Sequence, residues 1–448
     1  MKIGFLPLYI QLYKERCASY TPAAEAFAGK IAGLLREEGF EVVAAPVCCL
    51  EEEFAAAVAR FEQEGCCAIA TLHLAYSPSL ESAPVLAKSD LPVVVMDTTP
   101  DSFDHVDEDI LMANHGIHGV QDFCNLLLRY RKRFLLTAGP WQDPGFFAGV
   151  ARQLKAAAMA YRMTHIRVGA VGGEFKGMWD FRVPEGTFGM QVVPYTAQPG
   201  PTEAEIDAEE ALDRQRYAWD EGLSRQIYRT TMTECLKLRS WIEKEKLDAL
   251  TVCFCGIDRR NGWETLPFLE CSKAMGRGIG YAGEGDTLTA ASTRCLMEAF
   301  PRTSFIEMFC PDWDGNRIFT SHMGEMNLEL CPTKPLLVEY MYGLTDVSHP
   351  AVAYGNLPAG DAVIADLAPG PDGTFTLICA KVHFQLPSPQ STSRNCGWFV
   401  PASGDIRKFL AAYSRLGGTH HLTACYGADL DTLAEWAKLM GWSFAVIE

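Results

Sequence analysis

The feature that most constrains the fold is an alternation of short apolar runs with amphipathic, helix-length segments. Lys2–Tyr9 is an apolar run of strand length, and Thr21-Pro22 then supplies a helix N-cap with proline at the first helical position. A helix is expected over Ala23–Glu38, ending at Gly39. Further strands are expected at 41–47, 67–74, 92–97, 133–138 and 166–171, and further helices at 51–64, 119–129 and 144–161. This pattern predicts doubly wound, Rossmann-like α/β structure, with a parallel sheet covered on both faces.

The pattern changes along the chain. The polar stretch Pro199–Glu210 predicts a boundary or a long loop, and a helical region follows as far as about Glu245. A strand at Ala249–Cys255 and a helix at Glu264–Met275 continue the α/β pattern. After about residue 300, short alternating segments separated by Gly, Pro and Asp predict an antiparallel β-barrel, at 317–323, 362–367, 374–382 and 397–400, closed by a helix at 431–440 and a strand at 443–447.

Length agrees with this division, because 448 residues correspond to roughly three domains. We therefore expect an N-terminal α/β domain over 1–163, a central α/β domain over 164–300 and a β-rich domain over 301–448. The two α/β domains are predicted to be Rossmann-like, and the last to be the barrel.

Net charge, hydropathy and cysteine usage limit the expected binding partners and cellular compartment of the protein. The net charge of −17 disfavours binding to nucleic acid or to anionic membrane surfaces. No apolar run approaches the ~18 residues of a membrane span, and the N-terminus lacks the pattern of a signal peptide. The 16 cysteines include no CxxC pair, so most are expected to be buried thiols in a reducing cytoplasm.

Four separated groups of residues can carry chemistry. Glu284 lies between two glycines, and Glu307 stands in an apolar strand, where a carboxylate is costly unless it is paired or bound to metal. His322 lies in a predicted strand, and His420 and His421 follow two glycines. Taken singly, each has an ordinary alternative: a solvated turn acid, an acid at a strand edge, or a histidine satisfied in the core.

Together the two carboxylates and two imidazoles form a coherent set. Mixed oxygen and nitrogen ligands suit Mn²⁺, Mg²⁺ or Co²⁺, whereas an all-thiolate set would have indicated zinc. Carboxylates beside such a cation also suit proton transfer next to an enediolate. Gly169-Ala170-Val171-Gly172-Gly173 is only a loose glycine cluster, so a nucleotide-dependent oxidoreductase has no support.

The segments 281–291, 303–307, 321–325 and 417–421 resemble, in order, the active-site motifs of L-arabinose isomerases. The resemblance implies that Glu284, Glu307, His322 and His421 bind a divalent metal, usually Mn²⁺, and that the two glutamates form the acid/base pair. It further implies that the residues near the substrate include Asp286, Phe305, Glu325 and His420.

Weaker similarity extends upstream, over residues 114–123, 140–143 and 11–13. It implies that Gln11 contacts the substrate and that His118 is lent to a neighbouring subunit's active site. The chain departs from the family at His115, Gln121 and Asp122, over the segment 172–180, and in being shorter. These departures leave the identity of the sugar open.

We therefore expect a cytoplasmic, metal-dependent aldose–ketose isomerase that converts L-arabinose to L-ribulose, or a related sugar, through a cis-enediol. The family implies a homo-oligomer, a trimer or hexamer with shared active sites. Two alternatives remain: a fucose-isomerase-like enzyme acting on another pentose, hexose or deoxy sugar, and a sugar-binding homologue that does not catalyse. The sequence does not assign the physiological sugar, the metal used in the cell, the oligomeric state or the step that each glutamate performs.

Overall fold

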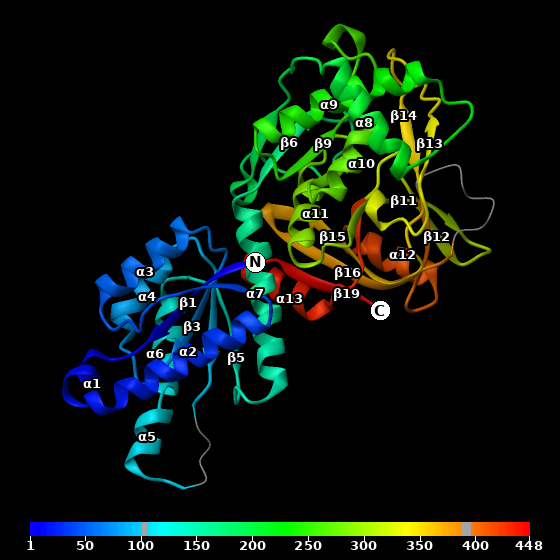
Figure 1. Cartoon of the computed structure of the whole chain (residues 1–448). Coiled ribbons are helices and arrows are strands. Elements are labelled where there is room, and N and C mark those ends of the chain that lie inside the picture. The colour runs from blue at the N-terminus through cyan, green and yellow to red at the C-terminus, as the bar shows by residue number, and fades with distance from the viewer. Residues whose placement is uncertain (101–104, 387–395) are drawn as a thin grey trace. The chain divides into compact units, whose positions relative to one another are not determined.

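The computed structural model describes residues 1–100, 105–386 and 396–448. The chain divides into two compact units, each made of two separate stretches of the sequence. The first comprises Met1–Arg162 and Asp431–Gly441, and the second Met163–Leu430 and Trp442–Glu448. Each unit is described by itself below, and many of its elements are labelled in Figure 1.

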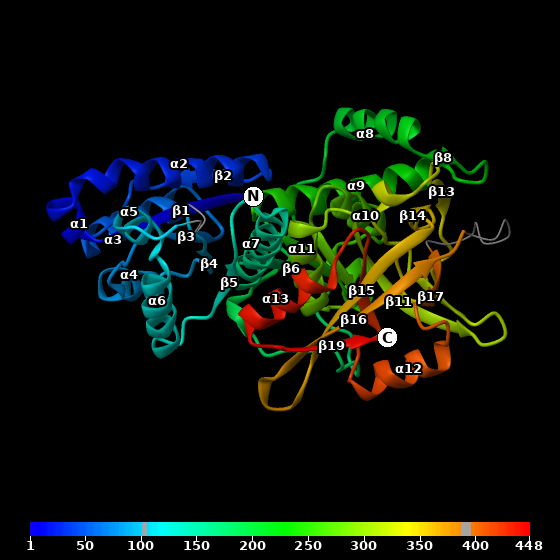
Figure 2. The same ribbon diagram turned by 90° about the horizontal axis from the view of Figure 1, so that it is seen from below.

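The first unit is built on a parallel sheet of five strands in the order β2-β1-β3-β4-β5. Helix α2 covers one face, and α4 and α6 cover the other (Figure 2). The strands are β1 (Lys2–Leu8), β2 (Glu41–Ala44), β3 (Ile69–His73), β4 (Val93–Asp97) and β5 (Phe134–Ala138). The helices are α1 (Gln11–Arg16), α2 (Thr21–Glu37), α3 (Glu51–Gln63), α4 (Ser79–Lys88), α5 (Glu108–Asn114), α6 (Ile117–Arg129), α7 (Pro144–Thr164) and α13 (Leu430–Met440).

This sheet is parallel, as the apolar runs predict. Its core contains Leu6 and Leu8 of β1, Val93 of β4, and the helix residues Phe61 and Phe123, all of them buried. Strands buried on both faces need no alternation of apolar and polar residues, which explains the continuous runs. Helices α4 and α5 were not predicted; α4 contains Pro84 in its interior, a residue that normally argues against a helix.

The second unit begins with a parallel sheet in the order β10-β9-β6-β7. Its strands are β6 (Arg167–Val171), β7 (Gln191–Pro194), β9 (Ala249–Val252) and β10 (Gly280–Gly283), and the accompanying helices are α8 (Glu203–Arg216), α9 (Arg225–Lys244), α10 (Phe268–Gly276) and α11 (Thr287–Ala299). The prediction of a loop over Pro199–Glu210 is wrong beyond Thr202, because α8 starts there. Thr202 and Glu205 form a capping box at its N-terminus.

Seven further strands form a largely antiparallel sheet in the order β15-β18-β11-β12-β17-β16-β19, in which β15 also pairs with β16. Only β16 and β19 run parallel. The strands are β11 (Thr303–Asp312), β12 (Arg317–Ser321), β15 (Gly360–Pro369), β16 (Phe375–Phe384), β17 (Cys396–Pro401), β18 (His421–Cys425) and β19 (Ser443–Ile447), with helix α12 (Ile406–Arg415). A small sheet that was not predicted joins β14 (Ala351–Tyr354), β13 (Leu336–Glu339) and β8 (Ala218–Trp219).

Short 3₁₀ helices complete the list at Ala18–Tyr20, Thr187–Gly189, Phe254–Gly256, Arg259–Asn261, Leu328–Leu330 and Pro371–Gly373. No helix among the described residues is long and apolar enough to cross a membrane. Several cysteines, including Cys48, Cys66, Cys271 and Cys379, are buried, as expected of thiols that act as small apolar residues.

Candidate metal centre

The backbone at Glu284 turns sharply where β10 ends. Glu284 has a φ of 63°, a left-handed conformation that is uncommon for a residue other than glycine. Two neighbours on β9 hold the turn: the Glu284 N–H donates to the Val252 carbonyl (2.8 Å), and the Thr251 hydroxyl donates to the Gly283 carbonyl (3.1 Å). Such a conformation costs about 1–3 kcal/mol and tends to occur at functional sites. The Glu284 side chain is buried with it, at 7 % exposure.

His322 follows β12, and His421 begins β18. Each imidazole is held through Nδ1 by a buried carboxylate, His322 by Glu325 (2.9 Å) and His421 by Asp286 (3.1 Å). Nε2 of both rings is buried and has no hydrogen-bond partner. Carboxylates on Nδ1 are the usual partners of metal-binding histidines, because they fix the ring and leave Nε2 free to bind the metal.

The two carboxylates behind the histidines are anchored in turn. Glu325 accepts a hydrogen bond from the Tyr281 hydroxyl (2.5 Å), and Asp286 accepts one from the Thr289 N–H (2.8 Å) as the N-cap of α11. Neither Glu325 nor Asp286 is exposed by more than 2 %. The structure thus places both residues against histidines, and the substrate contacts predicted for them stay predictions.

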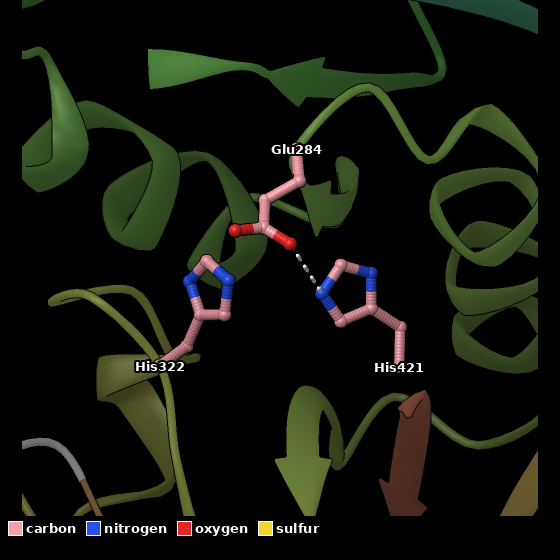
Figure 3. A group of neighbouring side chains, drawn as sticks. All are labelled: Glu284, His322 and His421. Carbon is pink, nitrogen blue, oxygen red and sulfur yellow. Dashed lines mark ion pairs between the residues drawn. The ribbon is translucent and has the colours of Figure 1, made fainter. Parts of the chain in front are cut away.

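Glu284, His322 and His421 bring one ligand atom each to within 4.8 Å of one another. Figure 3 shows both rings turned toward the carboxylate, and His421 Nε2 lies 3.7 Å from Glu284 Oε2. Two orphaned imidazole nitrogens beside a carboxylate oxygen, all buried, fit a divalent cation. We call these three residues the metal triad.

Aromatic rings enclose the histidines. Phe305 on β11 contacts His322 and His421 edge-on, with its ring centroid 5.1 Å from each. Phe181 stacks on His421 at 5.2 Å with an angle of 7° between the rings. Both phenylalanines are buried. A dry, low-dielectric wall of this kind strengthens electrostatic interactions inside the site.

This buried environment shifts the pKa values of His421 and His322 in opposite directions. Burial lowers the pKa of His421 well below its usual range, and the neighbouring His322 and His420 lower it further. Burial acts the same way on His322, but the charge and hydrogen bond of Glu325 outweigh it and raise the pKa of His322 to about 9. Glu284 has a lowered pKa, because interactions with His420, His322 and His421 outweigh the effect of burial.

Glu307 on β11 stands opposite His421 of β18 in the antiparallel register. Its carboxyl group is half-buried, and burial raises its pKa, with added repulsion from Glu284 and Glu325. Glu307 is not a member of the metal triad, and its predicted role as a ligand stays a prediction. A carboxyl group with a raised pKa beside a cation site is suited to accepting and returning a proton.

His420 has a partner that was not predicted. Its Nδ1 lies 2.7 Å from Oδ2 of Asp180, which also accepts the His420 backbone N–H at 3.1 Å. Burial would raise the pKa of Asp180, but these hydrogen bonds outweigh it and lower the pKa to about 2. No motif marked Asp180; it stands in the segment where the chain departs from the family pattern.

The remaining predicted residues lie in the first unit. Gln11 starts α1 and donates to Glu15 (3.0 Å), and His118 is exposed on α6 with its ring 5.8 Å from that of His115. Their predicted contacts with substrate, and the lending of His118 to a neighbouring subunit, stay predictions.

Comparison with known proteins finds similarity in the C-terminal part of the chain and beyond it. Residues 302–443, which include Glu307, His322 and His421, match the family described as the L-arabinose isomerase C-terminal domain. The L-arabinose isomerase of Klebsiella pneumoniae is 26% identical over 380 residues, covering 77% of this chain and 73% of that protein. That of Tolumonas auensis is 26% identical over 435 residues, covering 89% and 84%.

A third relative, L-arabinose isomerase 1 of Bacillus licheniformis, is 25% identical over 407 residues, covering 84% of this chain and 80% of that protein. These matches extend well beyond the C-terminal domain and over most of both chains. The chain is therefore similar to L-arabinose isomerases over most of its length, and its residues 302–443 match that family's C-terminal domain.

Proposed function

We propose that this protein is a metal-dependent aldose–ketose isomerase that converts L-arabinose to L-ribulose, or a related sugar, through a cis-enediol. The observation that carries the proposal is the metal triad: two buried imidazoles with free Nε2 atoms beside the Glu284 carboxylate. The named relatives are isomerases, and the residue types at this site suit the same chemistry.

Glu284, His322 and His421, with Glu307 beside them, would hold the cation, and Mn²⁺, Co²⁺ and Mg²⁺ are the candidates. When bound, a divalent cation supplies Lewis-acid stabilisation of the negative charge that develops on the sugar oxygens.

The carboxylates move the protons. One glutamate, Glu307 or Glu284, takes the proton from C2 of the open-chain aldose, which gives the cis-enediolate, and protonation of O1 gives the cis-enediol. The same proton is returned to C1, while the other carboxylate carries a proton from O2 to O1. The product is the ketose, with a carbonyl at C2 and a hydroxymethyl group at C1. The raised pKa of Glu307, caused mainly by burial, supports a role for this carboxyl group in proton transfer.

The proposal extends to partners and architecture. It includes a cytoplasmic homo-oligomer, a trimer or hexamer, in which Gln11 and His118 serve a shared site. It also includes the three-domain division at 163 and 300. Because β15 pairs with both β18 and β16, we propose that six strands of the large sheet close into the predicted barrel.

An NMR screen of aldoses and ketoses tests the function. Each sugar is incubated with the protein and Mn²⁺, then with EDTA in place of the metal. We expect a new set of anomeric signals from one sugar, lost with EDTA. A fucose-isomerase-like enzyme would turn over another pentose, hexose or deoxy sugar in place of L-arabinose. Binding of a sugar without turnover across the whole panel would identify the non-catalytic homologue.

Variants test the roles of the glutamates. Glu284→Gln and Glu307→Gln should each lower kcat by 10²-fold or more, within the range of about 10²–10⁴ for general acid–base catalysis. Glu185→Gln, an exposed acid of the same unit, is the control and should match the wild type. Near wild-type turnover by either active-site variant with metal bound would contradict the assignment. Loss of turnover in His118→Ala would support a shared site.

A further inference from the structure

The loop that follows β6, residues 172–182, reaches the metal centre from a part of the chain that carries no family motif. Its Phe175 N–H donates to the Glu284 carbonyl (3.0 Å), and its Phe181 ring stacks on His421. Arg182 fixes the loop by donating to the Phe175 carbonyl (2.7 Å). The loop therefore contacts two members of the metal triad without supplying a metal ligand.

The start of this loop is closely packed against neighbouring backbone. A Cβ atom on Gly285 would lie 2.7 Å from the Gly173 carbonyl oxygen and from Glu174 Cα. A Cβ atom on Gly172 would lie 2.1 Å from the Cys253 carbonyl oxygen. Such close approaches are possible only for glycine. They bring residues 172–174 of the loop against the turns that follow β9 and β10.

Asp180 uses one oxygen atom to fix His420. Oδ2 accepts from the His420 backbone N–H at 3.1 Å and lies 2.7 Å from Nδ1 of the ring. Two contacts to the same residue set both the backbone position and the rotation of the imidazole. They also select the form of the ring that carries a proton on Nδ1, as a carboxylate does for a catalytic histidine.

With Nδ1 held, the other nitrogen faces the reacting groups. His420 Nε2 lies 3.7 Å from Glu284 Oε2, beyond hydrogen-bonding distance, and has no hydrogen-bond partner. The atom is buried even though the side chain as a whole is 30 % exposed. A buried nitrogen without a partner, next to a carboxylate of the metal triad, is placed to meet an oxygen of the substrate.

We infer that Asp180 is a positioning residue, which fixes the imidazole of His420 so that Nε2 binds a sugar oxygen during isomerisation. The inference rests on the proposed function and deepens it. Asp180 lies outside the metal triad, so its loss affects turnover much more than metal binding. Carboxylates that orient metal-binding histidines typically contribute about 10- to 100-fold to metal affinity or activity, and we expect an effect of that order on turnover here.

The test uses the full-length, Mn²⁺-loaded protein and the sugar found by the NMR screen. Asp180→Ala should lower kcat 10- to 100-fold, with KM changed less than about 3-fold. Asp180→Glu should recover part of the loss, because a carboxylate can still reach Nδ1. Asp361→Asn is the matched control: Asp361 also lies 2.7 Å from a histidine Nδ1, that of His383, away from the site, and its variant should behave as the wild type.

Two further measurements separate positioning from a general structural role. Mn²⁺ affinity, measured by electron paramagnetic resonance, should stay within about 3-fold of wild type in Asp180→Ala, whereas His421→Ala should lose it. In ¹⁵N-histidine spectra of the protein loaded with diamagnetic Mg²⁺ in place of Mn²⁺, one imidazole signal, assigned by its absence in His420→Gln, should lose its Nδ1–H signature in Asp180→Ala. If Asp180→Ala does not fold, Asp180→Asn takes its place in each measurement.

Three outcomes would overturn the inference: unchanged kcat in Asp180→Ala, a loss of Mn²⁺ affinity as large as that of His421→Ala, or an unchanged His420 signal. The NMR signature needs no turnover. If no sugar is isomerised by the wild type, the proposed function fails, and the fixing of His420 by Asp180 is still decided by the spectra.

Discussion

At the scale of single residues, the metal centre depends on glycine as much as on its ligands. A Cβ atom on Gly283 would lie 2.4 Å from Cε1 and 2.6 Å from Nε2 of His322. Only a residue without a side chain lets this imidazole pass so close to the end of β10. The position before Glu284 is therefore as restricted as Glu284 itself.

Gly283→Ala should displace the His322 ring and weaken Mn²⁺ binding by about 10- to 100-fold, as expected when a ligand loses its orientation. Gly343→Ala is the control, since a Cβ atom there meets nothing within 4 Å. Isothermal titration with Mn²⁺ measures both variants. Equal affinities in the two would show that His322 does not bind the metal from its present position.

His73, at the end of β3, makes the first unit sensitive to acid. Its ring is buried, bonded through Nδ1 to the Ser77 hydroxyl (2.8 Å), and burial lowers its pKa to about 3. An unfolded chain binds this proton near pH 6.5, so the stabilising contribution is present above that pH. It is lost progressively as the pH falls from about 6.5 toward 3.

Between pH 7.5 and pH 5 this group should remove roughly 2 kcal/mol from the stability of the first unit. His73→Gln should be less stable than the wild type at pH 7.5. Between pH 7.5 and pH 5, however, its free energy of unfolding should fall by roughly 2 kcal/mol less than that of the wild type. Urea unfolding at both pH values measures the difference, with the exposed His383→Gln as control. A wild-type stability that falls no more steeply than that of His73→Gln would contradict the prediction.

The residues that motifs could identify are those close to one another in sequence. Glu284 and Asp286, or His322 and Glu325, are two or three positions apart, and their spacing is visible in the chain. Asp180 and His420 are 240 positions apart, and Asp180 has no distinctive neighbours. Only the folded chain brings the two together, so this contact could not be predicted.

At the scale of secondary structure, α8 shows how a charged segment can become buried. Lys273 of α10 is almost fully buried and pairs with Glu209 (2.8 Å) and Asp213 (2.6 Å) of α8. Arg239 of α9 pairs with Glu209 and Glu270. The sequence of this acidic segment predicts a loop because its cationic partners lie on other helices and are not visible locally. Its capping box, in contrast, is a local signal that could have predicted the helix.

Lys273→Met should destabilise the second unit by about 3–5 kcal/mol, because it leaves buried carboxylates without their cation. Lys408→Met is the control; it removes an exposed pair with Asp405 and should change stability by no more than about 0.5 kcal/mol. Chemical denaturation provides both values. Similar small changes in the two variants would show that the α8–α10 pairs add nothing to stability.

At the scale of the whole molecule, the sequence predicted the parallel sheets and the antiparallel C-terminal sheet, but not how the chain is shared between the units. A continuous apolar run of strand length indicates a parallel sheet, because such a strand is buried on both faces. Alternation of apolar and polar residues indicates an antiparallel sheet with one face exposed. The pairing of β8 with β13 could not be predicted, because a strand of two residues, Ala218–Trp219, has no pattern to recognise.

The metal triad lies wholly in the second unit, so bound Mn²⁺ should stabilise that unit. The gain is about 2.7 kcal/mol when the free metal is 100 times its Kd. Hydrogen–deuterium exchange with and without Mn²⁺ should show added protection around residues 251–286 and 303–322, and little change in β1 to β5. Protection concentrated in the first unit would place the metal elsewhere.

Helix α13 belongs to the first unit, although residues 163–430 separate it from the rest of that unit in the sequence. Its residues Leu433, Trp436 and Ala437 are completely buried. When the ribosome has synthesised β5 and α7, the first unit still lacks α13. This unit can therefore complete its fold only after α13 has been synthesised. A fragment ending near residue 162 lacks this helix, so the N-terminal third should not be expected to fold when it is expressed alone.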